Sequence, residues 1–198
     1  MKISLLENSH SFLKEALDKA VFSEKDPIQW KFAVFDLVQS IELSLKEKLR
    51  REHPVLIYSN IDRLENTVSI DQAINRLSKI SKLYFSRSDI NILTSAKKWR
   101  NLIVHYEFEI NPKELKPLFA KLLGFLSYFH RKHLDDTLDN IVPTALWEKA
   151  IEIFEYSSEL YERAKKLFDE EEIDSSLIWA CEKCGWDAFV IQDDINTC

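Results

Sequence analysis

The chain has 198 residues, of which 45% are hydrophobic, enough to bury one main core and to carry an appendage. Two glycines and five prolines are too few for a fold rich in tight hairpins, so the composition favours helices. The formal charge of −6 hides an asymmetry. Residues 145–198 hold 5 basic and 14 acidic groups (net −9). Residues 1–144 hold the other 22 basic and 19 acidic groups (net +3).

The sequence also limits where the protein is expected to act. No stretch is apolar for long enough to span a bilayer, and Glu7, Asn8 and His10 interrupt the region where a signal peptide would be apolar. The three cysteines lie in the last 18 residues, two of them as a Cys-x-x-Cys pair, which suits a metal site in a reducing compartment. We therefore expect a cytoplasmic protein without membrane contact.

Five helices are predicted in a first domain, residues 1–140. Apolar residues recur at spacings of three and four, and capping residues mark three helix starts at Asp26-Pro27, Ser69 and Asn111-Pro112. The predicted helices cover residues 5–20, 28–51, 70–83, 88–105 and 112–133. The expected fold class is all-α, an antiparallel helical bundle.

Two shorter units are predicted after the bundle. The polar stretch 135–144 contains Pro143 and indicates a connection, which places a domain boundary near residue 140. Residues 141–176 are predicted to form an acidic connecting helix, because apolar residues recur there at helical spacing opposite a row of glutamates. In the last unit, residues 177–198, the apolar run 188–191 predicts a short strand.

Basic residues gather between Arg76 and Arg100, where seven of them accompany a single acid, Asp89. They are Arg76, Lys79, Lys82, Arg87, Lys97, Lys98 and Arg100. Such a cluster is typical of a phosphate-binding surface. A solvated helix face is the alternative that a run of charge leaves open.

The end of the fourth predicted helix combines polar chemistry with apolar anchors. At 100° per residue, Asn101 and His105 share a face and Arg100 lies at its edge. Apolar side chains such as Trp99 occupy the other side. A helix anchored in the core by that apolar side could hold an amide, an imidazole and several cations toward one groove.

The pattern Arg100-Asn101-x-x-x-His105, on a late helix that follows a long second helix, resembles the nuclease signature of the HEPN superfamily. The resemblance extends over residues 1–135. It implies a metal-independent endoribonuclease of toxin, abortive-infection or antiphage defence systems, with Arg100 and His105 as catalytic residues and Asn101 as the polar residue beside the arginine. It also implies a homodimer, and it is compatible with an antitoxin or other regulatory protein as a partner.

The chemistry of RNA suits these residue types. RNA can be cleaved by attack of its own 2′-OH on the adjacent phosphate, so the protein needs only to move protons and to stabilise charge on the phosphorus oxygens. A histidine exchanges protons near neutral pH, and an arginine fork binds two phosphate oxygens. No cofactor is expected for catalysis. Lys97, Lys98, Arg87 and Lys82 are the expected contacts to the RNA backbone.

Two alternatives remain open at this point. Arg100 and His105 could be structural, with Arg100 paired to an acid of the long helix such as Glu42 or Asp36. The domain could also be a non-catalytic HEPN adaptor that binds nucleic acid or a nucleotide and recruits a protein. In toxins that are modified by a nucleotidyltransferase, a tyrosine often stands two positions after the histidine. Glu107 takes that place here, which argues against such regulation.

The cysteine tail resembles part of a zinc ribbon. Cys181 and Cys184 form a knuckle followed by Gly185, and Cys198 would be the third ligand of a structural Zn²⁺ ion. Tetrahedral zinc needs four ligands, and the fourth would fall beyond Cys198, so we expect a truncated or incomplete site. The acidic helix and the ribbon could bind a partner or shield the basic groove.

Other histidines carry less information. His130 and His133 are three residues apart at the end of the predicted fifth helix, a spacing that could bind a metal ion. Their sequence neighbourhood offers only Asp135 and Asp136 as further ligands, so a solvated helix end is the favoured interpretation. His10 and His53 have no supporting residues in the sequence.

Overall fold

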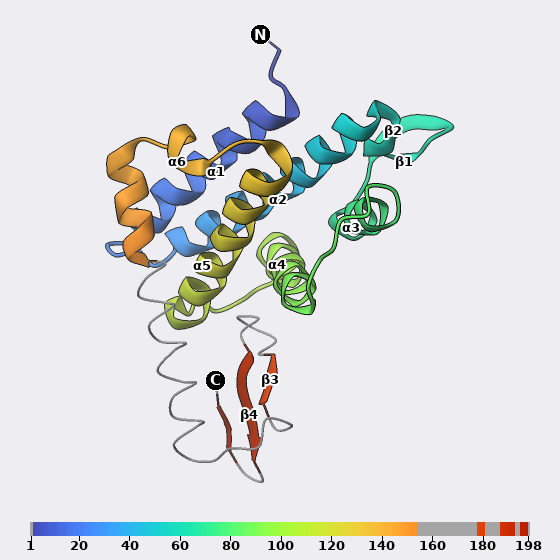
Figure 1. Ribbon diagram of the computed structural model, residues 1–198. Coiled ribbons are helices and arrows are strands. Elements are labelled where there is room, and N and C mark those ends of the chain that lie inside the picture. Colours follow the sequence, from blue (N-terminus) through green and yellow to red (C-terminus); the bar gives the residue numbers. More distant parts are fainter. Residues whose placement is uncertain (1, 154–177, 181–186, 193–194, 198) are drawn as a thin grey trace.

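The computed structural model describes residues 2–153, 178–180, 187–192 and 195–197 (Figure 1). Within them the protein is mostly helical, as the composition predicts. Two small antiparallel sheets accompany the helices, one of two strands and one of three. No helix in these ranges combines the length and the apolar character needed to cross a bilayer.

The first two helices form an antiparallel pair that carries much of the core (Figure 1). Helix α1 (Leu5–Phe22) begins with a capping box in which Ser4 and Glu7 satisfy each other's backbone amides. Helix α2 (Gln29–Glu52) buries one apolar face at helical spacing. Both helices lie within two residues of their predicted ends.

A hairpin that the sequence does not predict follows α2. The 3-10 turn Pro54–Ile57 leads into strands β1 (Tyr58–Asn60) and β2 (Arg63–Thr67), which pair antiparallel. The tight turn contains no glycine, and instead the Asn60 side chain accepts a hydrogen bond from the Asp62 amide (2.8 Å). Because the expected turn residues and a hydrophobic alternation are both missing, the sequence shows no hairpin signal.

Three further helices complete the bundle. Helix α3 (Ile70–Lys79) and helix α4 (Arg87–His105) each begin with a capping box, at Ser69 and Ser86. Helix α3 ends earlier than predicted because Lys82 adopts a left-handed backbone (φ 55°), and Leu83 then bonds back to the Leu77 carbonyl. Helix α5 (Pro112–Phe129) crosses α2 and passes into one π-helical turn, His130–Leu134.

The core continues past residue 140, where the sequence predicts a domain boundary. The short helix α6 (Leu138–Ile141) and the helical residues 144–153 follow the turn after α5. Leu138, Val142 and Ala150 are buried and belong to the same hydrophobic core as α1 and α2. The polar stretch 135–144 is therefore a connection that packs onto the bundle.

The last described residues form a separate three-stranded antiparallel sheet. Its strands are β3 (Ile178–Ala180), β4 (Asp187–Gln192) and β5 (Ile195–Thr197), in the order β3-β4-β5. Strand β4 confirms the strand predicted at residues 188–191. The predicted zinc ligands Cys181, Cys184 and Cys198 lie outside the described residues, as does the predicted acidic helix beyond residue 153.

Candidate active site on helix α4

Helix α4 is held rigidly by its apolar side. Leu93, Ala96 and Trp99 are buried against the bundle, and the Trp99 ring meets Phe108 edge to face at 6.3 Å between centroids. Phe108 follows the helix and packs against the core, so the chain is also anchored beyond the C-terminal end of α4. The last turn of the helix is fixed from both sides.

The polar residues of the motif face away from that anchor. Asn101 is half-buried and His105 is exposed. They are four residues apart on one continuous helix, so they share a face. His105 is the last residue of α4, and Tyr106 then turns into extended backbone with 69% of its surface exposed. An imidazole in this position is open to a large ligand such as RNA.

Arg100 is half-buried at the edge of the same face. Its Nη1 donates to the Asn101 side-chain oxygen (3.3 Å), while its Nε atom is buried and has no hydrogen-bond partner among the described residues. Neither of the acids considered as structural partners pairs with Arg100 among the described residues. Glu42 pairs with Lys46 at 2.5 Å, and the pKa of Asp36 responds to burial, Glu15 and Lys19 and not to Arg100. The guanidinium therefore keeps capacity to bind an anion.

The predicted phosphate contacts divide into two groups. Arg87, Lys97 and Lys98 lie within about 100° of Asn101 and His105 around α4, so they form one outward stripe along the helix. Lys97 also pairs with Asp71 of α3. Lys82 precedes the helix and is remote from the motif, since α4 alone separates Arg87 from His105 by roughly 27 Å along its axis.

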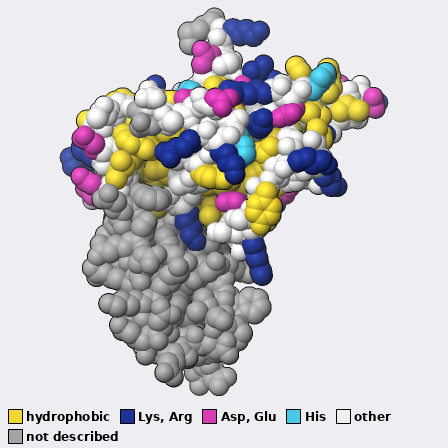
Figure 2. All heavy atoms as spheres, in the orientation of Figure 1, with side chains coloured by type: hydrophobic (Ala, Val, Ile, Leu, Met, Phe, Trp, Pro, Cys, Tyr) yellow, Lys and Arg dark blue, Asp and Glu magenta, His cyan; other side chains and the backbone are white. Residues whose placement is uncertain are grey.

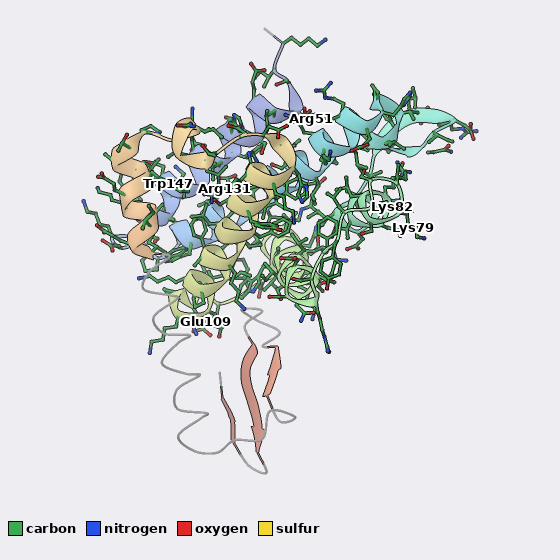
Figure 3. All side chains as sticks on the ribbon, in the orientation of Figure 1. Arg51, Lys79, Lys82, Glu109, Arg131 and Trp147 are labelled. Atoms are coloured by element: carbon green, nitrogen blue, oxygen red, sulfur yellow. The ribbon has the colours of Figure 1, made fainter. Side chains whose placement is uncertain are left out.

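The figures show the same separation. In Figure 3, Lys79 and Lys82 lie beside α3, whereas Glu109, four residues beyond His105, lies on the other side of α4. The Lys and Arg side chains on the face drawn in Figure 2 are spread among other types and do not form one continuous patch. Arg76 belongs to the fold, because its guanidinium donates to the carbonyls of Leu56, Tyr58 and Ser59.

A groove runs between α3 and α4 beside the outward stripe. Its lining comes from both helices: Asp71, Ile74, Asn75, Ser78, Lys79, Ile90, Leu93 and Thr94. Thr94, which lines the groove, lies on the same side of α4 as Lys97 and Asn101, about one and two turns before them. The groove and the motif therefore share one side of the helix.

The sequence missed a second polar cluster. The expectation that His130 lies on a solvated helix end is wrong, because its side chain is fully buried (0% exposed). It meets His10 of α1 and Asp136, and burial lowers its pKa to about 4. His10 and His130 are 120 positions apart in the sequence, so only the packing of α1 against the end of α5 could bring them together.

Comparison with known protein families, with curated proteins and with solved structures finds no match to this chain. The geometry and the chemistry of the α4 residues are therefore the basis for assigning a function.

Proposed function

We propose that the protein is a metal-independent endoribonuclease of the HEPN type, acting within a defence or toxin system. The observation that carries this proposal is the arrangement of His105, Asn101 and Arg100 at one end of a core-anchored helix, with the imidazole exposed. The buried Arg100 Nε, which has no hydrogen-bond partner in the part of the chain that the structure describes, supports it, because an unsatisfied cationic donor is costly unless a ligand binds to it.

Each residue has a distinct role in the proposed reaction. The 2′-OH of one nucleotide attacks the adjacent phosphorus, the P–O5′ bond breaks, and a 2′,3′-cyclic phosphate and a free 5′-OH result. His105 takes the proton from the 2′-OH or gives one to the leaving 5′-oxygen. Arg100 binds the non-bridging oxygens as their charge increases, and Asn101 holds the guanidinium through the hydrogen bond of 3.3 Å.

The reaction favours a dimer. A single histidine cannot act as base and acid in the same step, whereas a two-fold pair of α4 helices would bring two imidazoles to one phosphate. The stripe of Arg87, Lys97 and Lys98 would then continue from the shared cleft along each protomer and bind the RNA backbone. The exposed hydrophobic residues at the same end of α4, Val104 and Tyr106, are suitable contacts for a second copy.

The test is an RNA cleavage assay in excess EDTA with the His105→Ala variant. We expect the wild-type protein to give products that end in 2′,3′-cyclic phosphate, and the variant to lose cleavage while it keeps the wild-type thermal unfolding curve. His53→Ala is the matched control, because His53 is also exposed but lies at the far end of α2. RNA that is retained but never cut by the wild-type protein would instead indicate a non-catalytic binding domain.

A further inference from the structure

A cluster of two histidines and one aspartate lies where α1 meets the turn after α5, and none of its members belongs to α4. His10 comes from α1, His130 opens the π-helical turn after α5, and Asp136 follows that turn. The Asp136 Oδ2 atom is 3.1 Å from His10 Nε2 and 3.8 Å from His130 Nδ1. All three ligand atoms lie within 4.8 Å of one another. Nitrogen and oxygen ligands of a tetrahedral zinc ion are about 3.3 Å apart, given bonds of roughly 2.0–2.1 Å.

The two imidazoles present unused nitrogens to the same space. His10 Nε2 and His130 Nδ1 are both buried atoms without a hydrogen-bond partner in the described part of the chain. His10 Nε2 is close to Asp136, but the approach lacks the geometry of a hydrogen bond. An orphaned nitrogen on the fully buried His130 side chain destabilises the fold unless something binds it. A bound cation would satisfy both nitrogens and the carboxylate together.

A second layer of hydrogen bonds orients these groups. The other ring nitrogen of His130, Nε2, is 2.8 Å from Ser44 Oγ, and Ser44 in turn donates to the Ser40 carbonyl (2.9 Å). With the proton on Nε2, His130 donates to Ser44 and its Nδ1 lone pair faces Asp136. The other carboxylate oxygen, Asp136 Oδ1, accepts from the Thr137 amide (2.9 Å). Metal-binding histidines and carboxylates are commonly held by such outer partners.

The backbone around the cluster is also unusual. Residues His130–Leu134 form a π-helical turn, a rare feature that is frequent at functional sites. Asp135 ends the turn in the left-handed region (φ 54°), which sends the chain back toward α1 and brings Asp136 against His10. Arg51 of α2 donates to the Leu134 carbonyl (2.9 Å) and fixes the turn in place; Figure 3 labels it where the turn passes over α2.

The protonation state suits a ligand role. Burial lowers the pKa of His130 to about 4 and also lowers the pKa of His10, while Asp136 opposes both shifts. Burial thus favours the neutral form of both imidazoles, which is the form in which histidine binds a metal ion. The His10 and Asp136 side chains remain 20% and 24% exposed, so an ion could enter from the surface.

We propose that His10, His130 and Asp136 bind one divalent first-row transition-metal ion of the zinc type, with the fourth position left to water. The ion would link α1 to the turn after α5, over the C-terminal part of α2. This site is separate from the α4 motif and carries no part of the proposed cleavage, so the two proposals stand or fall independently.

Cobalt and zinc binding to the full chain test the site. The background is the variant in which Cys181, Cys184 and Cys198 are all changed to serine, so that thiolates cannot contribute. We expect this untagged protein, stripped with chelator, to take up one equivalent of Co²⁺ with a visible d–d absorption band and no thiolate charge-transfer band. Excess Zn²⁺ should displace the band and raise the melting temperature.

Surface-accessible ligands are changed next, because His130 variants could fail to fold. His10→Ala and Asp136→Asn should each abolish the one-equivalent binding, and Ser44→Ala should weaken it about 10- to 100-fold as an outer partner. His133→Ala is the matched control. His133 lies three residues after His130 within the same π-helical turn, and this variant should bind the metal ion normally. Absence of binding in the cysteine-free background, or binding that His10→Ala leaves unchanged, would overturn the proposal.

Discussion

At the scale of single residues, the α4 motif differs from its neighbours in how its polar groups are satisfied. Other cations of the bundle have acidic partners, such as Lys97 of α4 with Asp71 and Lys46 of α2 with Glu42. Among the described residues, Arg100 bonds to the neutral Asn101 side chain and its Nε atom has no partner. A guanidinium that is positioned but incompletely paired suits transient binding of phosphate better than a structural role.

Arg100→Lys tests that interpretation. The substitution keeps the charge but removes the fork and the contact to Asn101, so we expect the cleavage rate to fall about 10²- to 10³-fold. RNA affinity should change by less than about threefold, since affinity depends mainly on charge. Single-turnover cleavage and filter binding measure the two quantities. Arg63→Lys, on the exposed strand β2, is the control and should leave both unchanged. Equal losses in rate and affinity would assign Arg100 to binding alone.

Asp36 gives a prediction about pH. Burial and the neighbouring Glu15 raise its pKa from 3.8 to about 6. The folded protein therefore binds the Asp36 proton more tightly than the unfolded chain does. The stabilisation that comes from this protonation is fully present below pH 3.8 and is lost as the pH rises through 6. At pH 7.5 the charged, half-buried carboxylate destabilises the fold.

We expect Asp36→Asn to raise the free energy of unfolding by about 1 kcal/mol at pH 7.5, a value reduced from the full shift because the side chain is partly exposed. At pH 4 the gain should vanish. Urea unfolding at several pH values provides the measurement, with the exposed Glu24→Gln as a control for the loss of one negative charge. A gain of the same size at both pH values would rule out the titration of Asp36 as its cause.

At the scale of elements, local sequence explains the helices well and the hairpin poorly. Apolar periodicity is a local signal that predicts the five main helices, α2 and α4 to within one residue at each end. The predicted caps at Ser69 and Asn111 are confirmed, whereas the one predicted at Asp26 is wrong, because α2 begins after Ile28 without a side-chain cap. The hairpin β1–β2 has no hydrophobic alternation, and all five residues of β2 are exposed. Its position depends on Arg76 of α3, whose guanidinium binds three carbonyls of the segment 56–59. Contacts of this kind between distant residues are invisible in one sequence.

Arg76→Met should therefore loosen the hairpin locally. Methionine keeps the apolar stem but leaves the three carbonyls without their donor, which costs about 1.5–3 kcal/mol for hydrogen bonds to a charged group. We expect faster hydrogen exchange at the amides of residues 58–67 and little change in α5. Arg63→Met, on the outer face of β2, should not have this effect. Unchanged protection of the hairpin would show that Arg76 is dispensable there.

The candidate sites divide in the same way. The face shared by Asn101 and His105 follows from helix geometry alone, so the sequence predicts it. Burial of His130 and its approach to His10 depend on how α1 packs against the end of α5, which no local pattern records. The change from α-helix to a π turn at His130 also shifts the following residues around the axis, and simple periodicity does not predict it.

At the scale of the whole molecule, the proposed cleavage requires two copies. If each active cleft needs a histidine from both protomers, protomers mixed at random give activity that falls with the square of the wild-type fraction. We expect this square dependence when wild-type and His105→Ala chains are denatured together and refolded at varied ratios. Light scattering should show a dimer at every ratio. A linear dependence would mean that each protomer cleaves alone and would remove the composite cleft from the mechanism.

Lys82 shows how stability and binding can oppose each other in this molecule. Its backbone is left-handed, a conformation that costs a residue with a Cβ atom about 1–2 kcal/mol and costs glycine almost nothing. A glycine here would relax the end of α3, yet it would also remove one cation from the approach to α4. Under the proposed function, a more heat-stable loop would thus carry one cation fewer at the far end of the basic stripe, where an RNA chain would first approach α4.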